Sequence, residues 1–191
     1  MELDCVTLEE GPFGIESQAD VCNVEPLIAD FVQSDTAAKA FIISCYSDPG
    51  LTLCREVTDR PVFGIAECAM LTALTRAQSF GVISINSKSI LRHARYMREL
   101  LLHNHCSGDR ALELTVAEVA SSNDTFGEME RIGKQLRDKD GARCIIMGCA
   151  GMARYRIPLE ESLGLPVIDP TQAAAGLAIS AVHLANAVSL T

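Results

Sequence analysis

Short apolar runs of strand length alternate along this chain with segments whose apolar residues recur at helical spacing. Such alternation predicts an α/β fold, in which helices cover both faces of a parallel sheet. The expected strands are almost continuously apolar, which is typical of strands buried on both faces. We expect strands over 3–8, 39–44, 61–65, 80–85, 112–116, 142–148 and 165–168. We expect helices over 24–33, 51–57, 69–78, 89–102, 126–139 and 172–188.

The charge and length of the chain limit the classes of protein to which it could belong. A chain of 191 residues has room for one medium domain or two small ones. The formal net charge is −9, with acids and bases mixed, so the basic surface typical of nucleic-acid binding is missing. No apolar run is long enough to span a bilayer, and residues 1–20 do not resemble a secretory signal. We therefore expect a cytoplasmic protein that binds neither nucleic acid nor membrane.

Eight cysteines are present, and none forms a CxxC pair. In a cytoplasmic protein they are expected to stay reduced, and most should be small buried core residues. The segment 103–106 (His-Asn-His-Cys) suggests zinc, but its ligands are too close together and no second cluster follows. We expect no metal site.

Two cysteines stand out because the chain repeats itself. The segment FIISC at 41–45 resembles IIMGC at 145–149, and each is an apolar run that ends in a cysteine. A second pair follows, PVFGIAECA from Pro61 and PVIDPTQAA from Pro166, and both run into alanine-rich helices. The repeat predicts two similar halves that place Cys45 and Cys149 at the carboxyl ends of equivalent strands, where parallel sheets bind ligands. Two buried core thiols are the alternative interpretation.

Two thiols facing one cleft suit the inversion of a carbon that bears an acidic C–H. One thiolate removes the proton from one face, and the other thiol returns a proton to the opposite face. A free thiol titrates near ~8.5, so only about 3% is thiolate at pH 7. A helix N-terminus lowers that value, and small residues after each cysteine leave backbone N–H groups free to hold an enolate-like oxygen. No metal or organic cofactor is needed.

Five segments together resemble the hydantoin and allantoin racemase group of the aspartate/glutamate racemase superfamily. They are VTLEEGPFGIES at 6–17, CYSDPGL at 45–51, PVFGIAECA at 61–69, IIMGCAGMA at 145–153 and GLPVIDPTQAA at 164–174. The resemblance implies two Rossmann-like halves related by a pseudo-twofold axis, with the active site between them. We assign residues 1–79 plus 170–191 to the first half and 80–169 to the second.

The same resemblance implies that Cys45 and Cys149 are the catalytic acid–base pair. It implies a small-molecule substrate, no cofactor and a homo-oligomeric assembly. Residues that follow each cysteine would hold the acidic group of the substrate, and a hydroxyl at the end of a second-half strand would join them. These expected substrate-binding residues are Tyr46, Ser47, Ser84, Ala150 and Gly151. Cys68 is the nearest competitor, but the repeat aligns it with Ala173, so we expect it to be a core residue.

The chain departs from the family pattern at its start. Family members usually carry a strand–loop–helix unit with an Asn-Pro-Asn-Thr-like motif before the segment at 6–17, whereas this sequence starts at Met1. We therefore expect the first strand–helix unit to be absent. The sequence favours a racemase of a cyclic amide or ureide. A superfamily decarboxylase or cis–trans isomerase, and a non-catalytic binding relative, are the alternatives.

Overall fold

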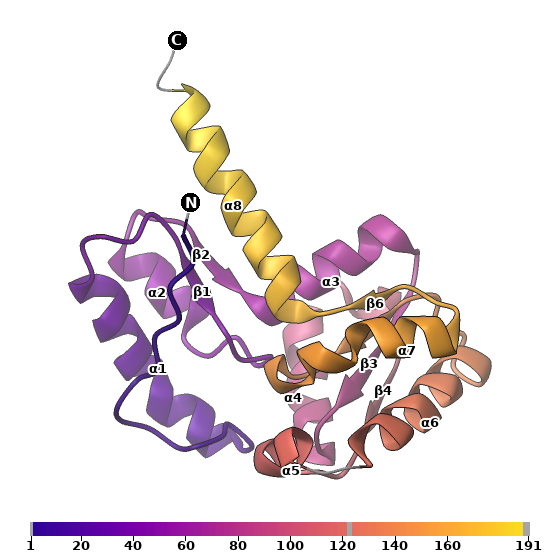
Figure 1. The fold of residues 1–191 in the computed structure, drawn as a ribbon. Coiled ribbons are helices and arrows are strands. Elements are labelled where there is room, and N and C mark those ends of the chain that lie inside the picture. Colours follow the sequence, from indigo (N-terminus) through magenta and orange to yellow (C-terminus); the bar gives the residue numbers. More distant parts are fainter. Residues whose placement is uncertain (1, 122–123, 189–191) are drawn as a thin grey trace.

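The computed structural model describes residues 2–121 and 124–188, which form two parallel sheets with helices around them (Figure 1). The smaller sheet pairs β1 with β2, and the four-stranded sheet has the order β4-β3-β5-β6. The strands are β1 (Phe41–Ile43), β2 (Val62–Gly64), β3 (Phe80–Ser84), β4 (Cys106–Ala111), β5 (Ile145–Met147) and β6 (Val167–Ile168). Every pair is parallel, which confirms the predicted α/β class with two parallel-sheet halves.

Helices connect the strands and cover the sheets on both sides. The α-helices are α1 (Gln18–Ser34), α2 (Leu51–Val57), α3 (Ile65–Arg76), α4 (Ser87–Glu99), α5 (Val116–Ser121), α6 (Thr125–Asp138), α7 (Arg156–Leu163) and α8 (Pro170–Val188). Two 3₁₀ segments, η1 (His103–His105) and η2 (Ala150–Tyr155), complete the order. No helix within the described residues is long and apolar enough to cross a membrane.

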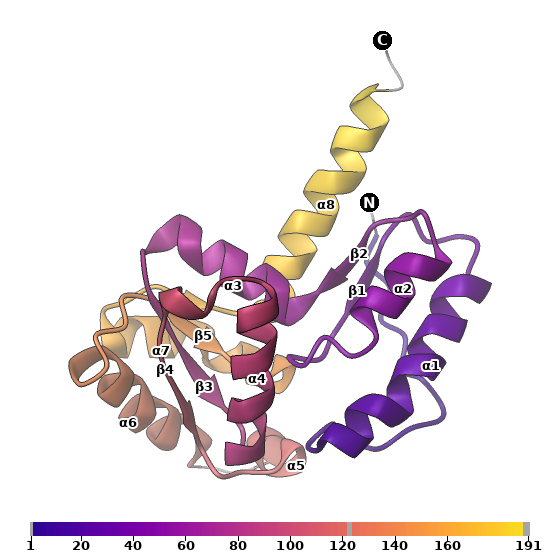
Figure 2. The same ribbon diagram turned by 180° about the vertical axis from the view of Figure 1, so that it is seen from behind.

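The four-stranded sheet is buried between two helical layers. On one face α6 and α7 contribute Met129, Leu136 and Leu159, which pack against Ile83 and Ile145. On the other face α3 and α4 pack against Phe80, Val82 and Ile146 (Figure 2). Successive strand residues thus face opposite layers, which explains why these strands are apolar throughout.

The predicted repeat appears in the fold as two units of the same order. One unit runs β1–α2–β2–α3, and the other runs β5–α7–β6–α8, with each first strand paired to the second. The last helices of the two units lie against each other and cross over between sheets (Figure 1). Helix α8 places Ala174 against Ile42 and Phe63 of the small sheet, while α3 covers the large one. The two halves are therefore interlocked, and the domain boundaries at 79 and 170 stay a prediction.

Two predicted strands are wrong. Residues 2–8 form no strand, and the side chains of Leu3 and Val6 are exposed, because this segment has no sheet partner among the described residues. The strand predicted over 112–116 lies earlier, as β4 with the sequence CSGDRA, and residues 112–115 form a loop before α5. Polar β4 pairs along the whole of β3, so its hydrogen bonds, and not apolar periodicity, define it.

Local capping explains where two of the helices begin. Ser17 and Asp20 form a reciprocal capping box, so α1 begins at Gln18, ahead of the apolar pattern from residue 24. The side chain of Asn86 accepts the Ser89 N–H and starts α4. Helices α5 and α7 were not predicted, because both are short and only partly apolar.

Candidate active site

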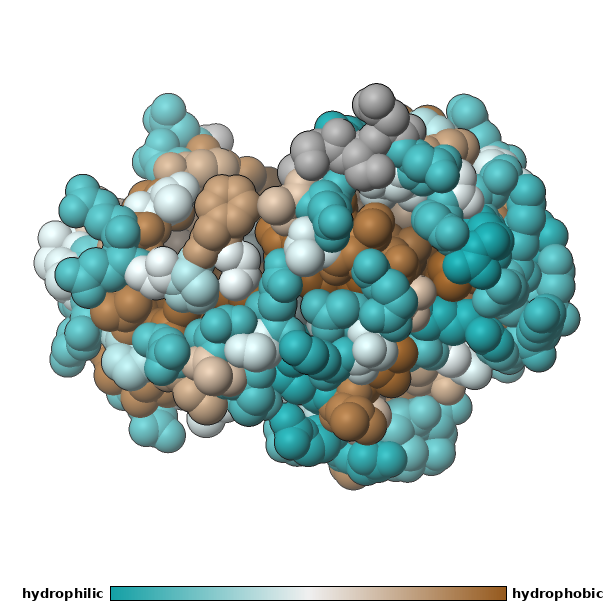
Figure 3. Space-filling model, turned by 90° about the horizontal axis from the view of Figure 1, so that it is seen from below, coloured by the Kyte–Doolittle hydropathy of each residue, from teal (hydrophilic) through white to brown (hydrophobic). Residues whose placement is uncertain are grey.

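Each cysteine of the repeat follows the end of a strand. Ser44 separates Cys45 from β1, and Gly148 separates Cys149 from β5. Both cysteines are half-buried free thiols. The carboxyl ends of parallel strands are where open α/β sheets bind ligands. Seen from below, the surface is largely hydrophilic and is indented between the two halves (Figure 3).

The two thiols are close enough to influence each other electrostatically. Burial raises the pKa of Cys45 to about 11, and the negative charges of Asp48 and of a Cys149 thiolate add to that rise. Burial also raises the pKa of Cys149. Since a charge on one thiol opposes a charge on the other, the favoured state of the pair has at most one thiolate.

Both thiols receive a backbone hydrogen bond from the residue two positions later. The Ser47 N–H donates to the Cys45 sulfur, and the Ser47 side chain also bonds to it, which lowers the pKa of that thiol. The Gly151 N–H does the same for Cys149. Equivalent positions of the two halves therefore stabilise a thiolate in the same way.

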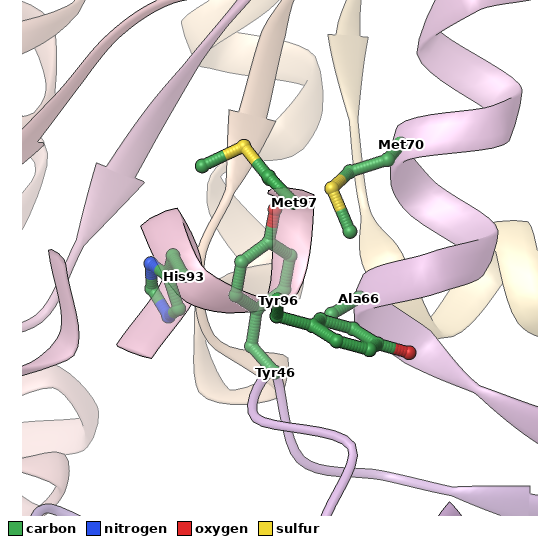
Figure 4. A pocket seen from close by; sticks show the side chains of 6 residues that line it. All are labelled: Tyr46, Ala66, Met70, His93, Tyr96 and Met97. Atoms are coloured by element: carbon green, nitrogen blue, oxygen red, sulfur yellow. The ribbon is translucent and has the colours of Figure 1, made fainter. Parts of the chain in front are cut away.

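The side chain of Tyr46 points away from the cysteines into the core. It is 5% exposed and lines a cavity of about 10 Å³ together with residues of α3 and α4 (Figure 4). Its hydroxyl finds no hydrogen-bond partner among the described residues. Tyr46 thus anchors the Cys45 turn in the second half, and any contact with substrate is left to its backbone.

Ser84 is fully buried at the end of β3 and belongs to a polar cluster. Its hydroxyl donates to the carboxylate of Asp109 and lies 3.2 Å from Nδ1 of His93. That same Nδ1 lies 2.8 Å from the other Asp109 oxygen. The structure therefore places the Ser84 hydroxyl inside a closed network, and its role as a substrate ligand stays a prediction.

The remaining predicted residues lie at the start of η2, with Cys149 as the N-cap. Ala150 packs with Ile65 and Ala174, whereas Gly151 is exposed. Cys68 is buried inside α3, where burial raises its pKa to about 12, in keeping with a core residue. It borders a groove of about 360 Å³ between α3 and α8, and neither Cys45 nor Cys149 lines that groove.

Helix α4 carries residues that the sequence analysis missed. Burial lowers the pKa of Arg92, and the negative charge of a Cys45 thiolate opposes that shift. Arg92 therefore lies within electrostatic range of Cys45. His93 contacts the ring of Tyr46, and the Tyr96 hydroxyl donates to Asp48 at 3.1 Å. One face of α4 therefore holds the Cys45 turn. The helix itself is predictable from its sequence, but the partner of that face is not.

No group of three His, Cys, Asp or Glu side chains within residues 2–121 and 124–188 is arranged to hold a metal ion. In the segment 103–106, His105 Nδ1 bonds to the carbonyl of Gln78 at 2.9 Å. Cys106 contacts the carbonyl of Gly108 at 3.5 Å. These side chains have structural partners of their own.

The two interlocked parallel-sheet halves have the fold of the Asp/Glu racemases. Comparison with known families agrees, since residues 1–178 match the model described as Asp/Glu/Hydantoin racemase. The chain belongs to this family of isomerases. A hydantoin racemase of Pseudomonas sp. (strain NS671) is 32% identical over 98% of this chain and 77% of its own length. One from Paenarthrobacter aurescens is 35% identical over 76% of this chain and 62% of its own length.

Solved structures give the same grouping. An allantoin racemase from Klebsiella pneumoniae superposes with a TM-score of 0.87 at 28% identity, over 93% of this chain and 74% of that one. Glutamate racemase from Francisella tularensis has a TM-score of 0.67 at 18% identity, and that likeness concerns the fold alone. The chain therefore has a hydantoin/allantoin racemase-like fold and covers 62% to 77% of the length of these three relatives.

Proposed function

We propose that this chain is a cofactor-independent racemase that inverts the acidic carbon of a hydantoin- or allantoin-type substrate, with Cys45 and Cys149 as the two bases. One observation carries the proposal. The two thiols follow equivalent strands of the two halves, a negative charge on Cys149 raises the pKa of Cys45, and each thiol accepts an N–H from the residue two positions later. The names of the relatives supply the substrate class, a cyclic amide or ureide of an amino acid.

The reaction balances without any other reactant. The thiolate of one cysteine takes the proton, so a C–H bond breaks and an S–H bond forms. The electron pair moves to the neighbouring carbonyl oxygen, which backbone N–H groups after Cys45 and Cys149 can stabilise. The opposite thiol then donates its proton to the other face of the carbon. Each turnover exchanges the roles of the two sulfurs, and the reverse reaction uses the same groups.

Two thiols in equivalent positions favour racemisation over the related decarboxylation. Protonation after loss of carbon dioxide needs one acid, whereas inversion of a C–H centre needs a group on each face. Tyr46, Ser47, Ser84, Ala150 and Gly151 are the proposed neighbours of the substrate. We further propose a homo-oligomeric enzyme of the cytoplasm, and light scattering of the purified chain measures the assembly.

Deuterium exchange tests the proposal directly. Single enantiomers of allantoin and of 5-substituted hydantoins are incubated in D₂O, with circular dichroism following inversion and NMR following exchange. We expect the wild type to do both, and Cys45→Ser and Cys149→Ser each to lose inversion. Cys68→Ala is the matched control, because that thiol is buried away from the pair. A folded wild type without exchange would instead indicate a non-catalytic binding relative.

A further inference from the structure

Asp48 lies three residues after Cys45, within the same turn. Its N–H donates to the Cys45 carbonyl at 2.9 Å, and its φ of 42° is in the left-handed region. The side chain is almost fully buried. A buried charge costs free energy of folding unless hydrogen bonds satisfy its carboxylate, and a positive φ is uncommon for a non-glycine residue. The hydrogen-bond partners of the Asp48 carboxylate therefore indicate its role in the structure.

The carboxylate of Asp48 binds the N-terminus of α3. Its two oxygens accept the N–H groups of Ala66 at 2.9 Å and Glu67 at 2.8 Å, and the Tyr96 hydroxyl donates to it at 3.1 Å. The first N–H groups of a helix have no partner inside the helix, and a negative charge is favourable there. The turn that carries Cys45 is thereby fastened to α3 and, through Tyr96, to α4.

Gly64 leaves the space that this carboxylate fills. It is the N-cap residue of α3, and a Cβ atom there would lie 2.2 Å from Cγ of Asp48. Its φ of −90° suits any residue, so the glycine is required by the close approach and not by backbone conformation. A carboxylate from a distant loop therefore stands where the side chain of an N-cap residue normally stands.

In the other half, the residue directly before the helix supplies the capping carboxylate. Asp169 immediately precedes α8, and its Oδ1 accepts the Gln172 N–H at 2.7 Å. In the repeat, Asp169 corresponds to Gly64, since each precedes the first residue of its helix. The capping carboxylate thus belongs to the helix segment in one half and to the cysteine turn in the other.

We propose that Asp48 is a positioning residue for Cys45, which fastens the Cys45 turn to α3 and sets a negative charge beside its thiol. The inference rests on the proposed role of Cys45 as an acid–base group. Its electrostatic part agrees with the direction already described, because the Asp48 charge raises the pKa of Cys45. The other titratable groups around the two residues are Arg92 and Tyr96 of α4, Glu67 and Cys68 of α3, Tyr46 and Cys149.

Two variants separate the two proposed effects of Asp48, which are the tether between the Cys45 turn and α3 and the negative charge beside the Cys45 thiol. Asp48→Asn removes the charge but keeps an oxygen that can accept one helix N–H. The double variant Asp48→Gly with Gly64→Asp moves the carboxylate onto the helix, as in the other half, and so keeps the charge and the cap while cutting the tether. Glycine suits the positive φ at 48. Asp169→Asn is the matched control, because it removes the charge of the equivalent cap of α8 and keeps the oxygen that accepts the Gln172 N–H.

The readout is the rate at which Cys45 is alkylated at pH 8, in a Cys149→Ser background, by neutral iodoacetamide and by anionic iodoacetate. Peptide mass spectrometry follows the modification of Cys45. Asp48→Asn is expected to raise the iodoacetate-to-iodoacetamide rate ratio about threefold, because the repelling charge is gone. The double variant is expected to keep that ratio but to react faster with both reagents, since the turn is released. Asp169→Asn is expected to change neither quantity.

Thermal melts show whether each variant is folded. An unchanged ratio in Asp48→Asn, or wild-type rates in the double variant, would reduce Asp48 to a helix cap and overturn the proposal. Alkylation needs no turnover, so this test stands apart from the racemase assay. A chain that fails to exchange deuterium would refute the proposed function and leave the role of Asp48 to be decided by its own measurement.

Discussion

The ring of Tyr46 meets the ring of His93 edge to face, with centroids 5.0 Å apart and an angle of 81° between the planes. Tyr46 follows Cys45 in the first half, and His93 belongs to α4, which packs on the sheet of the second. His93 is in turn held by Ser84 and Asp109. The position of the Cys45 turn therefore depends on a buried polar cluster of the opposite half.

Replacing Tyr46 by Phe should stabilise the protein. The Tyr46 hydroxyl is buried without a hydrogen-bond partner among the described residues, and an unsatisfied buried group costs about 1 to 3 kcal/mol. Phenylalanine removes that group and keeps the ring against His93. We expect the free energy of unfolding in urea to rise by about 1 kcal/mol with racemase activity kept. Tyr46→Ala, which deletes the ring, is the contrasting variant and should lose about 3 kcal/mol or more. A less stable Tyr46→Phe would reveal a partner for the hydroxyl.

Asp109→Ala should be strongly destabilising. It leaves His93 and Ser84 buried without their shared acceptor, and each unsatisfied buried polar group costs about 1 to 3 kcal/mol. The control lies on the adjacent residue of β4, Arg110, whose partner Asp140 is more exposed. Asp140→Ala should cost about 1 kcal/mol or less. If both variants lose the same free energy of unfolding in chemical denaturation, burial of the Ser84, His93 and Asp109 cluster does not explain its contribution to stability.

Racemase activity should increase with pH through the neutral range. Burial raises the pKa of both thiols, that of Cys45 to about 11, so both are protonated near neutral pH. Because the reaction begins with one thiolate, its population limits the rate on the acid side and grows about tenfold per pH unit below the pKa. We expect kcat/KM to rise steeply from about pH 7 to 9, after subtraction of the rate with Cys45→Ser. A flat profile would mean that a thiolate is already formed at pH 7.

The parts of the fold that sequence could predict are those set by local pattern. The strands that precede Cys45 and Cys149 are continuous apolar runs, and the repeat between them appears as two equivalent units. Strand β4 was misplaced because it carries Asp109 and Arg110, whose burial and pairing depend on α4 and on Asp140. Polar residues that find partners only in the folded chain do not follow apolar periodicity.

The candidate site divides in the same way. Two strand-end cysteines and the small residues after them can be located from sequence, because they are adjacent in the chain. Asp48 could not be given a role, since its partners at the start of α3 come 18 and 19 residues later. For the same reason α3 begins at Ile65, ahead of the predicted residue 69. The side chain of Tyr46 is directed into the core, a position that the sequence does not reveal, and its place beside the substrate stays a prediction.

Gly148→Ala tests how closely the Cys149 strand must approach its neighbour. A Cβ atom at this position would lie 2.7 Å from the carbonyl oxygen of Ile83, and the Gly148 N–H donates to that same oxygen at 2.8 Å. Backbone cannot move aside as a side chain does, so the end of β5 must shift and carry Cys149 with it. We expect a loss of about 1 to 3 kcal/mol in stability and a fall in kcat/KM. Gly176→Ala is the control, because this exposed position in α8 has nothing within 4 Å of an added Cβ, and it should gain up to about 1 kcal/mol. If Gly148→Ala keeps wild-type stability and turnover, the close packing of β5 on β3 does not determine where Cys149 lies.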